Sequence, residues 1–424
     1  MIFQKLGLNE QLLKALEHLN YKQPTDIQAK AIPVVLQGRD LLASAQTGTG
    51  KTASFALPLL HLLSNKQRAS ANQTKALILA PTRELALQIH DNIVEYGQFL
   101  RLRTSVVYGG VKINPQMMRL RGGTEILIAT PGRLLDLMHQ RAIRFDQLEY
   151  LVLDEADRML DMGFIHDIKR IMQALPRNRQ TMLFSATFPT EIRELCQKFL
   201  NQPIEVSVNP PNQTATTVKH MLHPVDKARK TALLSHLIRD KQWPQALIFS
   251  KTKHGANKLV KKLAEDGIVS MAIHGDKTQA QRVKALQEFK SGRIRYLIAT
   301  DIAARGIDID DLPIVVNFDL PQVAEDYVHR IGRTGRAGKV GHAISLVSAD
   351  EFLCLKQIEK LTKKQIVREE IEGFEATHIL PSSSNPNAVK RKTQSHWEKS
   401  RNQQRARQSQ ESQKKTFKPR SKQA

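Results

Sequence analysis

The sequence predicts two α/β domains, each built on a parallel β-sheet, that are joined by a linker and followed by a disordered basic tail. Short apolar runs alternate with longer segments of helical period, which is typical of a parallel sheet with crossover helices. The same alternation restarts in the middle of the chain, after a stretch rich in proline and asparagine. A chain of 424 residues is long enough for two or three domains at roughly 150 residues per domain.

The apolar runs are four or five residues long and end at residues that favour turns, so we expect them to be buried strands. In the first half they are residues 76–79, 125–129, 150–153 and 181–184, with segments of helical period such as 82–100 and 191–200. After residues 208–214 they are 246–249, 269–273, 296–299 and 314–317. The predicted units are an N-terminal region over 1–29, domains over 30–208 and 218–380, a linker over 209–217 and a tail over 381–424.

The charge is strongly positive, with 64 Lys and Arg against 41 Asp and Glu and a net charge of +23. Such an excess favours a polyanionic partner, either nucleic acid or an anionic membrane. Residues 381–424 hold twelve of the basic residues and two Glu, so the tail contributes +10 and the rest of the chain +13.

Only six of the 44 tail residues are apolar, so burial cannot offset the entropy of ordering them and we expect disorder. Trp397 and Phe417 would let the tail stack on bases while its Lys and Arg neutralise phosphates. A solvated tail that only keeps the protein soluble is the alternative.

Cys196 and Cys354 are the two cysteines of the chain, and they lie far apart in the sequence. Neither a disulfide framework nor a thiolate metal site is encoded, which predicts a cytoplasmic protein. No apolar run approaches the roughly 18 residues of a membrane span, and the first residues lack the pattern of a signal peptide. We expect neither export nor a membrane partner.

A phosphate-binding loop is predicted after the apolar residues 41–44. The segment matches G-x-x-x-x-G-K-[ST], except that alanine replaces the first glycine, and a helical segment follows it. Backbone N–H groups of such a loop surround phosphate oxygens, Lys51 would face the terminal phosphates, and the Thr52 hydroxyl would ligate Mg²⁺. A glycine-rich turn without a ligand is the alternative. The loop residues are Ala45, Gln46, Thr47, Gly48, Thr49, Gly50, Lys51 and Thr52.

An acidic segment, Asp154-Glu155-Ala156-Asp157, follows the predicted strand at 150–153. Ligands of open parallel sheets bind at the carboxyl ends of strands. Asp154 would hold Mg²⁺, usually through water, and Glu155 would orient and deprotonate the attacking water. A solvated acidic helix cap is the alternative, but together with the phosphate loop the segment favours hydrolysis of a nucleotide.

The second half lacks a phosphate loop but contains Arg330, Arg333 and Arg336, spaced three residues apart among glycines. Such a cluster could bind a nucleic-acid backbone or present arginine fingers to the γ-phosphate held by the first domain. A surface arginine face is the alternative for any one of them. Fingers on the second domain would require the two domains to close during catalysis.

Further motifs accompany these three sites. They are residues 21–28 with Phe3 upstream, 81–86, 109–110, 130–133, 185–187, 247–250, 279–282 and 299–308. As an ordered set, the motifs resemble those of the DEAD-box ATP-dependent RNA helicases over nearly all of residues 1–380. The resemblance implies two RecA-like domains, with residues 21–28 as the Q motif. Residues 108–118 and 159–168 are similar to the bacterial RhlE-type branch.

The resemblance implies roles for single residues around ATP. Gln28 would recognise adenine through its side-chain amide, which offers both a donor and an acceptor. Tyr21 would stack near the base with Phe3 behind it, although core packing is the alternative for both rings. Asp308 would approach the ribose.

The same resemblance implies that Arg333 and Arg336 are the arginine fingers. Ser185 and Thr187 would couple hydrolysis to RNA by contacting Asp157 and the second domain, with His329 nearby.

An RNA groove crossing both domains is also implied. Hydroxyl, N–H and guanidinium groups after apolar strands would contact phosphates and position a strand without reading its sequence. RNA and DNA differ in the 2′-OH, so the choice of RNA follows from the resemblance alone. The implied groove residues are Pro81, Thr82, Arg83, Gly109, Gly110, Thr130, Pro131, Gly132, Arg133, Gln279, Arg282, Thr300 and Asp301.

The predicted function is RNA-stimulated hydrolysis of ATP with Mg²⁺, coupled to local unwinding or remodelling of RNA duplexes. One alternative is an RNA chaperone or annealer in which the basic tail dominates and ATP regulates the grip. A DNA translocase is another, although no added wedge or DNA-reading domain is visible. Proteins of ribosome assembly or RNA degradation stay open as partners.

Overall fold

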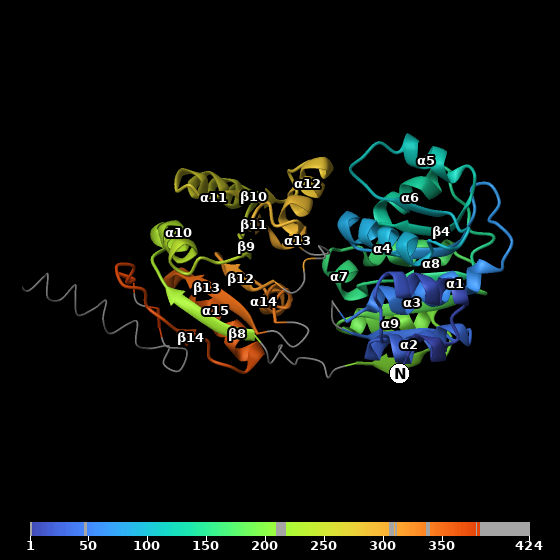
Figure 1. Cartoon of the computed structure of the whole chain (residues 1–424), viewed down its shortest axis with the longest axis horizontal. Helices are drawn as coiled ribbons and strands as arrows, with labels where there is room; N and C mark the ends of the chain where they lie inside the picture. The colour runs from blue at the N-terminus through green and yellow to red at the C-terminus, as the bar shows by residue number, and fades with distance from the viewer. Residues whose placement is uncertain are drawn as a thin grey trace, which may run out of the picture.

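The computed structural model describes residues 2–45, 49–208, 218–304, 309, 312–335, 340–378 and 380–381. The predicted linker and almost all of the predicted tail lie outside these residues. Within them the chain forms two α/β domains, each built on a parallel sheet of seven strands (Figure 1). The predicted fold class is therefore confirmed.

The sheet of the first domain has the strand order β3-β4-β2-β5-β6-β1-β7, and all neighbouring strands run parallel. Its strands are β1 (Leu41–Ser44), β2 (Thr74–Leu79), β3 (Thr104–Val107), β4 (Thr124–Ala129), β5 (Tyr150–Leu153), β6 (Gln180–Ser185) and β7 (Ile204–Ser207). Its helices are η1 (Phe3–Leu6), α1 (Glu10–His18), α2 (Asp26–Leu36), α3 (Lys51–Ser64), α4 (Arg83–Tyr96), α5 (Asn114–Leu120), α6 (Pro131–His139), α7 (Ala156–Asp161), α8 (Ile165–Ala174) and α9 (Thr190–Phe199).

Alternating strand residues divide the core of this domain between the two faces of the sheet, as the period of a strand requires. Ile78 of β2 packs on the face covered by α2, α3 and α4. Its neighbours Leu77 and Leu79 pack on the opposite face, against α6, α8 and α9. Because both faces are covered, strands such as β2, β4 and β5 are largely apolar, which is why they appear in the sequence as continuous apolar runs.

The second sheet has the order β10-β11-β9-β12-β13-β8-β14 and is also parallel. Its strands are β8 (Val218–Pro224), β9 (Ala246–Phe249), β10 (Ser270–Ile273), β11 (Tyr296–Ala299), β12 (Ile314–Asn317), β13 (Gly341–Val347) and β14 (Val367–Arg368). Its helices are η2 (Lys227–Arg229), α10 (Lys230–Asp240), α11 (Lys253–Glu265), α12 (Gln279–Lys290), α13 (Asp301–Ala304), α14 (Ala324–Ile331), η3 (Ala349–Glu351) and α15 (Phe352–Thr362).

Candidate active site and nucleic-acid interface

The predicted site segments follow the carboxyl ends of strands in both sheets. In the first domain they follow β1 to β6, and in the second the segments 247–250 and 299–308 lie at the ends of β9 and β11. The carboxyl ends of parallel strands share one edge, which is where open α/β sheets bind ligands. Helix α7 of the first domain and helices α13 and α14 of the second lie on the sides of the domains that face each other (Figure 1).

The phosphate loop places a buried cation at the start of α3. Lys51 is only 7% exposed, and within the described residues its Nζ has no hydrogen-bond partner. A buried ammonium without a partner is unfavourable, so the site fits an anionic ligand such as a terminal phosphate. Gln46, Thr47 and Gly48 lie outside the described residues.

Gln28 links the N-terminal region to the phosphate loop. Its Oε1 accepts a hydrogen bond from the N–H of Thr25 at 3.0 Å, and its Nε2 donates to the carbonyl of Gly50 at 3.2 Å. Gly50 has a left-handed φ of 91°, and a Cβ added there would lie 2.4 Å from Gln28 Nε2. The contact therefore requires glycine at position 50.

The two predicted aromatic residues differ in exposure. Phe3 is buried in the core of the first domain, which fits the packing alternative. Tyr21 is 42% exposed, and its hydroxyl lies 3.4 Å from that of Tyr96. The ring of Tyr21 is thus open to a ligand on one side. Asp308, predicted near the ribose, lies outside the described residues.

The acidic pair after β5, Asp154 and Glu155, is buried, and the pKa values of its two carboxyl groups are shifted in opposite directions. Burial raises the pKa of Asp154 to about 6; the charge of Glu155 adds to this effect and that of Lys51 opposes it. Burial would also raise the pKa of Glu155, but the positive charges of Arg158, Lys51 and Arg333 outweigh it and lower that pKa. Glu155 therefore stays ionised at neutral pH.

Glu155 has a strained backbone and a buried ion-pair partner. Its φ of 52° and ψ of 53° lie in the left-handed region, which residues other than glycine rarely adopt. This single residue turns the chain from Asp154 into α7. One turn later, Arg158 Nη1 donates to Glu155 Oε2, and both side chains are buried. The pair fixes the direction of the carboxylate.

Asp157 joins α7 to the segment after β6, as predicted for the coupling residues. Its Oδ2 accepts hydrogen bonds from the N–H and hydroxyl of Thr187, at 2.8 and 3.0 Å. Its own N–H donates to Ser185 Oγ at 3.1 Å, and Ser185 Oγ donates to the carbonyl of Thr187. Any shift of α7 therefore moves the segment 185–187 with it.

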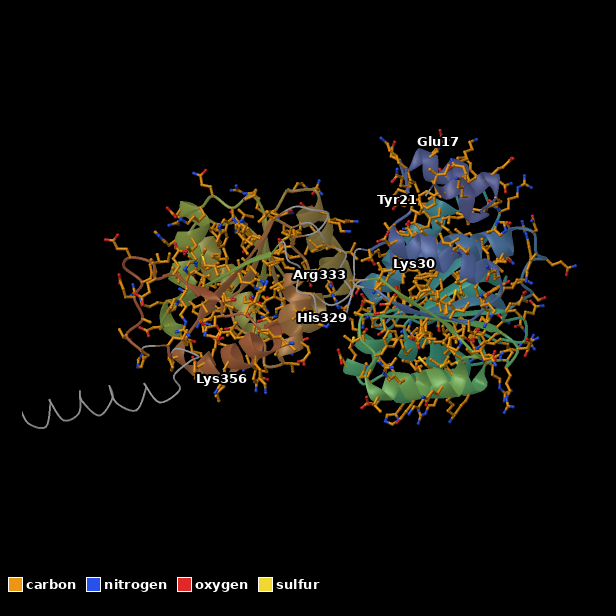
Figure 2. All side chains as sticks on the ribbon, turned by 90° about the horizontal axis from the view of Figure 1, so that it is seen from below. Glu17, Tyr21, Lys30, His329, Arg333 and Lys356 are labelled. Atoms are coloured by element: carbon orange, nitrogen blue, oxygen red, sulfur yellow. The ribbon has the colours of Figure 1, made fainter. Side chains whose placement is uncertain are left out.

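His329 and Arg333 of the second domain face these residues. Figure 2 shows both on the side of the second domain that faces the first. They line one small cavity together with Arg158. Burial lowers the pKa of His329, and the charge of Arg158 lowers it further while that of Asp157 opposes. Arg336 lies outside the described residues.

Arg83, a predicted groove residue, lies flat against the glycine pair after β3. Gly110 has a φ of 76°, and a Cβ added there would lie 2.2 Å from both terminal nitrogens of the Arg83 guanidinium. The absent side chain therefore creates the space that the guanidinium fills. This geometry gives the Gly109-Gly110 pair a function beyond a tight turn.

Two other predicted groove residues, Thr82 and Arg133, make hydrogen bonds to backbone groups of the first domain. Thr82 accepts a hydrogen bond from the N–H of Leu85 and so begins α4. Arg133 is buried, and its Nη2 donates to the carbonyl of Val111 at 2.9 Å, which braces the loop after β3. Pro81, Thr130 and Pro131 are also buried, and Gly132 is half-buried.

Gln279 and Arg282 form a bridge between the domains. Gln279 Nε2 donates to Glu84 Oε1 at 3.0 Å, and Arg282 Nη2 pairs with Glu84 Oε2 at 2.9 Å. Glu84 and Arg282 are largely buried there. Both predicted groove residues of α12 therefore bind a carboxylate of α4. The sequence analysis did not single out Glu84 within residues 81–86.

Asp301, also predicted in the groove, is paired with Arg330 of α14 through both carboxylate oxygens, at 2.6 and 2.7 Å. Thr300, the residue before it, accepts backbone hydrogen bonds from Ala303 and Ala304 and so starts α13.

Three functional contacts were missed by sequence reasoning, those of Glu84, Arg158 and Arg330. Glu84 and Arg330 have their partners in other elements, which no spacing reveals, whereas the pair of Arg158 with Glu155 has the i,i+3 spacing that a sequence can indicate. The bond between Gln28 and Thr25 did have a signal, because Thr-x-x-Gln is the pattern of a capping box.

Two features are absent from the part of the chain that the structure describes. No helix there has both the length and the apolar character to cross a membrane. No group of three or more His, Cys, Asp or Glu side chains there could hold a metal ion.

Two family models match the chain. The model described as DEAD/DEAH box helicase matches residues 25–195. The model described as Helicase conserved C-terminal domain matches residues 229–338.

Curated relatives and solved structures agree with these matches. The ATP-dependent RNA helicase CshA of Listeria monocytogenes is 44% identical over 86% of this chain and 69% of its own length. CshA of Geobacillus kaustophilus is 42% identical over 86% of this chain and 78% of its own length. A structure of S. cerevisiae Dbp5 bound to RNA and ADP BeF3 is 34% identical with a TM-score of 0.76, covering 87% of this chain and 95% of that one. The structure of a Dbp5 variant bound to the same ligands is 33% identical with a TM-score of 0.78, covering 88% of this chain and 96% of that one.

Proposed function

Because the chain belongs to the DEAD-box family of ATP-dependent RNA helicases, we propose that it hydrolyses ATP between its two domains and uses their closure to separate short RNA duplexes. The observation that carries this assignment is the buried Lys51 ammonium, which has no hydrogen-bond partner within the described residues. Its charge opposes the rise in the pKa of Asp154 and helps to lower that of Glu155. Phosphate oxygens are the ligand that would satisfy it. Arg333 of the second domain acts on the same Glu155 carboxylate, so both domains complete the site.

Glu155 would orient the attacking water and accept its proton. The three positive charges around it keep the carboxylate ionised, and the Arg158 ion pair holds its direction. A base positioned in this way contributes to hydrolysis by removing the proton as the water attacks. Arg333 and Arg336 would stabilise the charge on the transferred phosphoryl group.

Mg²⁺ fits the acidic side of this site. The carboxylate of Asp154 is buried, and its raised pKa means that a nearby cation would stabilise its ionised form. Asp154 and the Thr52 hydroxyl supply the oxygen ligands that Mg²⁺ prefers. When bound with ATP, the ion would neutralise phosphate charge.

RNA would lie along the carboxyl edges of both sheets. Arg83 against Gly110 presents a guanidinium from the first domain, and the Thr300 segment follows β11 in the second. Contacts of this kind hold the phosphate backbone without reading bases. Because closure brings both sites together, ATP and RNA should strengthen each other's binding.

The proposal is tested by steady-state hydrolysis of ATP with Mg²⁺, measured without nucleic acid, with single-stranded RNA and with DNA of the same sequence. We expect strong stimulation by RNA and little by DNA. Equal stimulation by DNA would reject the choice of RNA. Absence of any stimulation would reject coupling between the domains and favour the annealer reading.

The Gly110→Ala variant is expected to weaken binding of single-stranded RNA by about 10- to 100-fold, the value of one charge-assisted contact. The added methyl group would displace the Arg83 guanidinium, which lies against this glycine. Binding of ATP should not change, because Lys51 and Gln28 lie elsewhere. Fluorescence anisotropy with a labelled RNA measures the effect.

Gly163→Ala is the matched control for this change. Gly163 has a similar left-handed φ of 80°, but a Cβ there would meet nothing within 4 Å. Backbone strain is thus the same in both variants, and only Gly110→Ala displaces an arginine. Equal RNA affinities for the two variants would show that Arg83 contributes nothing to RNA binding.

We also propose that the chain lies in the RhlE-type branch, on the strength of residues 108–118 and 159–168. The curated relatives quoted above carry the name CshA instead. The proposed units are the Q-motif region 1–29, RecA-like domains 30–208 and 218–380, the linker 209–217 and the basic tail 381–424. The family matches at 25–195 and 229–338 fall largely within the two proposed domains.

A cytoplasmic site of action is proposed for the protein, since Cys196 and Cys354 are both free thiols, as is typical of a reducing compartment. RNA is its proposed ligand, and proteins of ribosome assembly or RNA degradation are proposed as partners. The basic tail is the segment whose charge suits a tether to RNA.

A further inference from the structure

The two sheets of the protein have the same strand order, and this places a second buried lysine where the first domain has Lys51. In the second sheet β8 stands in the place of β1, β12 in that of β5 and β13 in that of β6. Lys51 is the first residue of α3, which follows β1, and Lys230 is the first residue of α10, which follows β8. The two lysines therefore begin equivalent helices at the carboxyl edges of their sheets.

An acidic residue also recurs at the equivalent position of a nearby strand. Two residues after the end of β5 is Glu155, on whose carboxylate the charge of Lys51 acts. Two residues after the end of β12 is Asp319, whose Oδ1 lies 3.9 Å from Lys230 Nζ. Each lysine thus has a carboxylate from the equivalent strand close to it.

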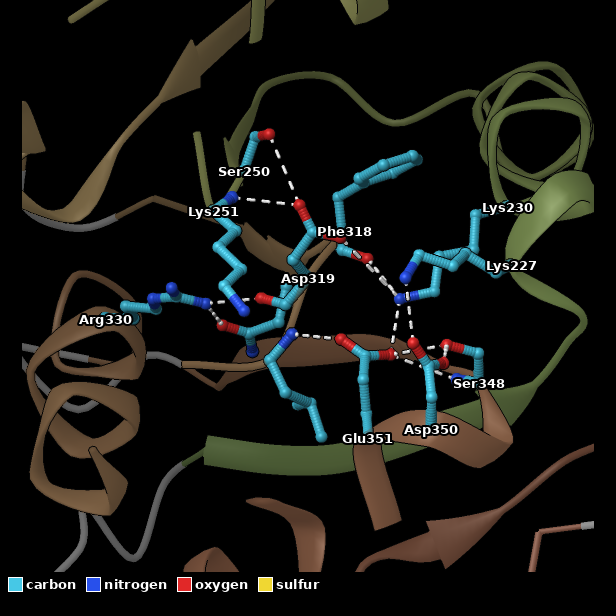
Figure 3. Close-up of polar contacts among 12 residues, drawn as sticks. Lys227, Lys230, Ser250, Lys251, Phe318, Asp319, Arg330, Ser348, Asp350 and Glu351 are labelled. Atoms are coloured by element: carbon cyan, nitrogen blue, oxygen red, sulfur yellow. Dashed lines mark hydrogen bonds and ion pairs between the residues drawn. The ribbon is translucent and has the colours of Figure 1, made fainter. Parts of the chain in front are cut away.

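The surroundings of the two lysines differ in one respect. Both side chains are buried, with residue exposures of 7% for Lys51 and 2% for Lys230. Lys51 Nζ has no hydrogen-bond partner within the described residues. Lys230 Nζ donates to Glu351 Oε2 at 2.5 Å and to the carbonyl of Phe318 at 2.8 Å, as Figure 3 shows. The protein itself therefore supplies the anion that a buried ammonium requires.

Glu351 receives the kinds of donor that a phosphate receives in a phosphate loop. Its Oε1 accepts a hydrogen bond from the N–H of Leu320 at 2.8 Å, and its Oε2 accepts one from the N–H of Ser348 at 3.0 Å. Together with the Lys230 ammonium, two backbone N–H groups thus surround one carboxylate. Backbone N–H groups and a lysine are also what surround a bound phosphate.

The loop before Lys230 is unsuited to a nucleotide. Its residues 225–229 contain no glycine, and η2 occupies Lys227–Arg229. A phosphate loop needs glycine so that successive backbone N–H groups can turn toward one phosphate chain. The place of the Glu351 carboxylate therefore suits a small oxyanion and not ATP.

Asp319 connects this group to the end of β9. Its Oδ2 accepts hydrogen bonds from the N–H of Lys251 at 2.9 Å and from Ser250 Oγ at 3.3 Å, which Figure 3 also shows. Its Oδ1 lies on the side of Lys230. The polar contacts around Lys230 therefore extend along the carboxyl edge of the second sheet, from β8 and β13 to β12 and β9.

We infer that the second domain contains a closed counterpart of the phosphate site, in which the Glu351 carboxylate takes the place of a phosphate on Lys230. The inference rests on the proposed function, because it takes Lys51 as the lysine that faces the phosphates of ATP. The edge of the second sheet is thus held by an anion that belongs to the chain, whereas the first domain gains and loses its phosphates with each ATP. Without Glu351, the site would accept inorganic phosphate.

The Glu351→Ala variant tests this inference. It leaves the buried Lys230 ammonium without its carboxylate, so we expect the melting temperature of the second domain to fall by about 5 to 15 °C. Inorganic phosphate should bind in the vacated place and recover about half of this loss. Thermal unfolding is measured in sodium phosphate and in sodium chloride of equal ionic strength. Hydrogen exchange of α10 shows whether phosphate acts at Lys230, and the parent protein gives the effect of phosphate on the first domain.

Asp350→Ala is the matched control. Asp350 precedes Glu351 in the chain, and its ion pair with Lys227, at 2.8 Å, is exposed to solvent. No buried charge loses its partner in this variant, so we expect a small fall in melting temperature and the phosphate response of the parent protein. An equal response to phosphate in Asp350→Ala and Glu351→Ala would show that phosphate does not replace the Glu351 carboxylate, and would overturn the inference.

Lys230→Met combined with Glu351→Ala keeps the test decisive if Glu351→Ala does not fold in chloride. The double variant has no unpaired buried charge, so it should be more stable than Glu351→Ala and respond to phosphate no more than the parent protein. Glu351→Ala itself should then fold in phosphate. If the double variant folds and Glu351→Ala gains nothing from phosphate, the inference is overturned and the proposed function stays intact. ATP binding that is unchanged by loss of Lys51 would instead overturn the proposed function and, with it, the equivalence of the two lysines.

Discussion

Exchange of Glu155 for glutamine is expected to lower kcat for RNA-stimulated ATP hydrolysis by about 10²- to 10⁴-fold, the usual contribution of a general base. Glutamine has nearly the same shape as glutamate but cannot accept the proton of the attacking water. The affinity for ATP should stay within about twofold, because Lys51 and the phosphate loop are unchanged. Single-turnover hydrolysis separates the two effects by measuring chemistry after ATP has bound.

Glu191→Gln is a suitable control, since it makes the same chemical change at an exposed position of α9. It should hydrolyse ATP at the rate of the parent protein. If Glu155→Gln did so too, Glu155 would not be the base. A loss of ATP affinity as large as the loss of kcat would instead mean that glutamine disturbs the Arg158 pair and the turn into α7.

Replacement of Lys51 by alanine is expected to weaken ATP binding by about 100-fold or more, because it removes a buried charge-assisted contact to the terminal phosphates. The Lys51 ammonium is buried and has no hydrogen-bond partner within the described residues, so its N–H groups can donate hydrogen bonds to a bound phosphate. Equilibrium titration with a fluorescent ATP analogue measures the change. Hydrolysis should disappear at ATP concentrations that saturate the parent protein.

The control for this change is Lys30→Ala, because Lys30 is an exposed lysine of α2 in the same domain. It removes the same charge from the protein without touching the phosphate loop, and ATP should bind as before. Unchanged binding in Lys51→Ala would reject the phosphate site. Weakened binding in both variants would indicate a general effect of net charge, which added salt would abolish.

The sequence predicted strands where short apolar runs occur, including the edge strand β10, but it missed the edge strands β3, β7 and β14 and the interior strands β8 and β13. Seven of the eight apolar runs lie within a strand, and the eighth, 269–273, overlaps β10 except for the exposed Val269. The runs mark strands because a parallel sheet covered on both faces needs apolar residues on both. Strand β3 begins with half-exposed Thr104 and Ser105, and β7 contains the exposed Glu205. In β3 and β7 these solvated residues interrupt the apolar run, so the pattern that marks the other strands is missing there.

The candidate site divides in the same way. Lys51, Asp154 and Glu155 could be found because their motifs lie within a few residues of one chain segment. The pairs Glu84 with Arg282 and Asp301 with Arg330 join residues 198 and 29 positions apart. Their partners are fixed only by how the helices pack, and the family resemblance had suggested RNA contacts for Arg282 and Asp301.

The geometry around Gly50 has a consequence for genetic suppression. A side chain at position 50 meets three separate obstacles, the Gln28 amide at 2.4 Å, the Thr25 hydroxyl at 3.0 Å and a backbone φ of 91°. A second mutation that shortens Gln28 removes only the first of these, because it changes neither Thr25 nor the backbone of the loop. No single compensating change at Gln28 can therefore restore the loop conformation in a chain that has lost Gly50. Loss of Gly50 must be reversed at position 50 itself.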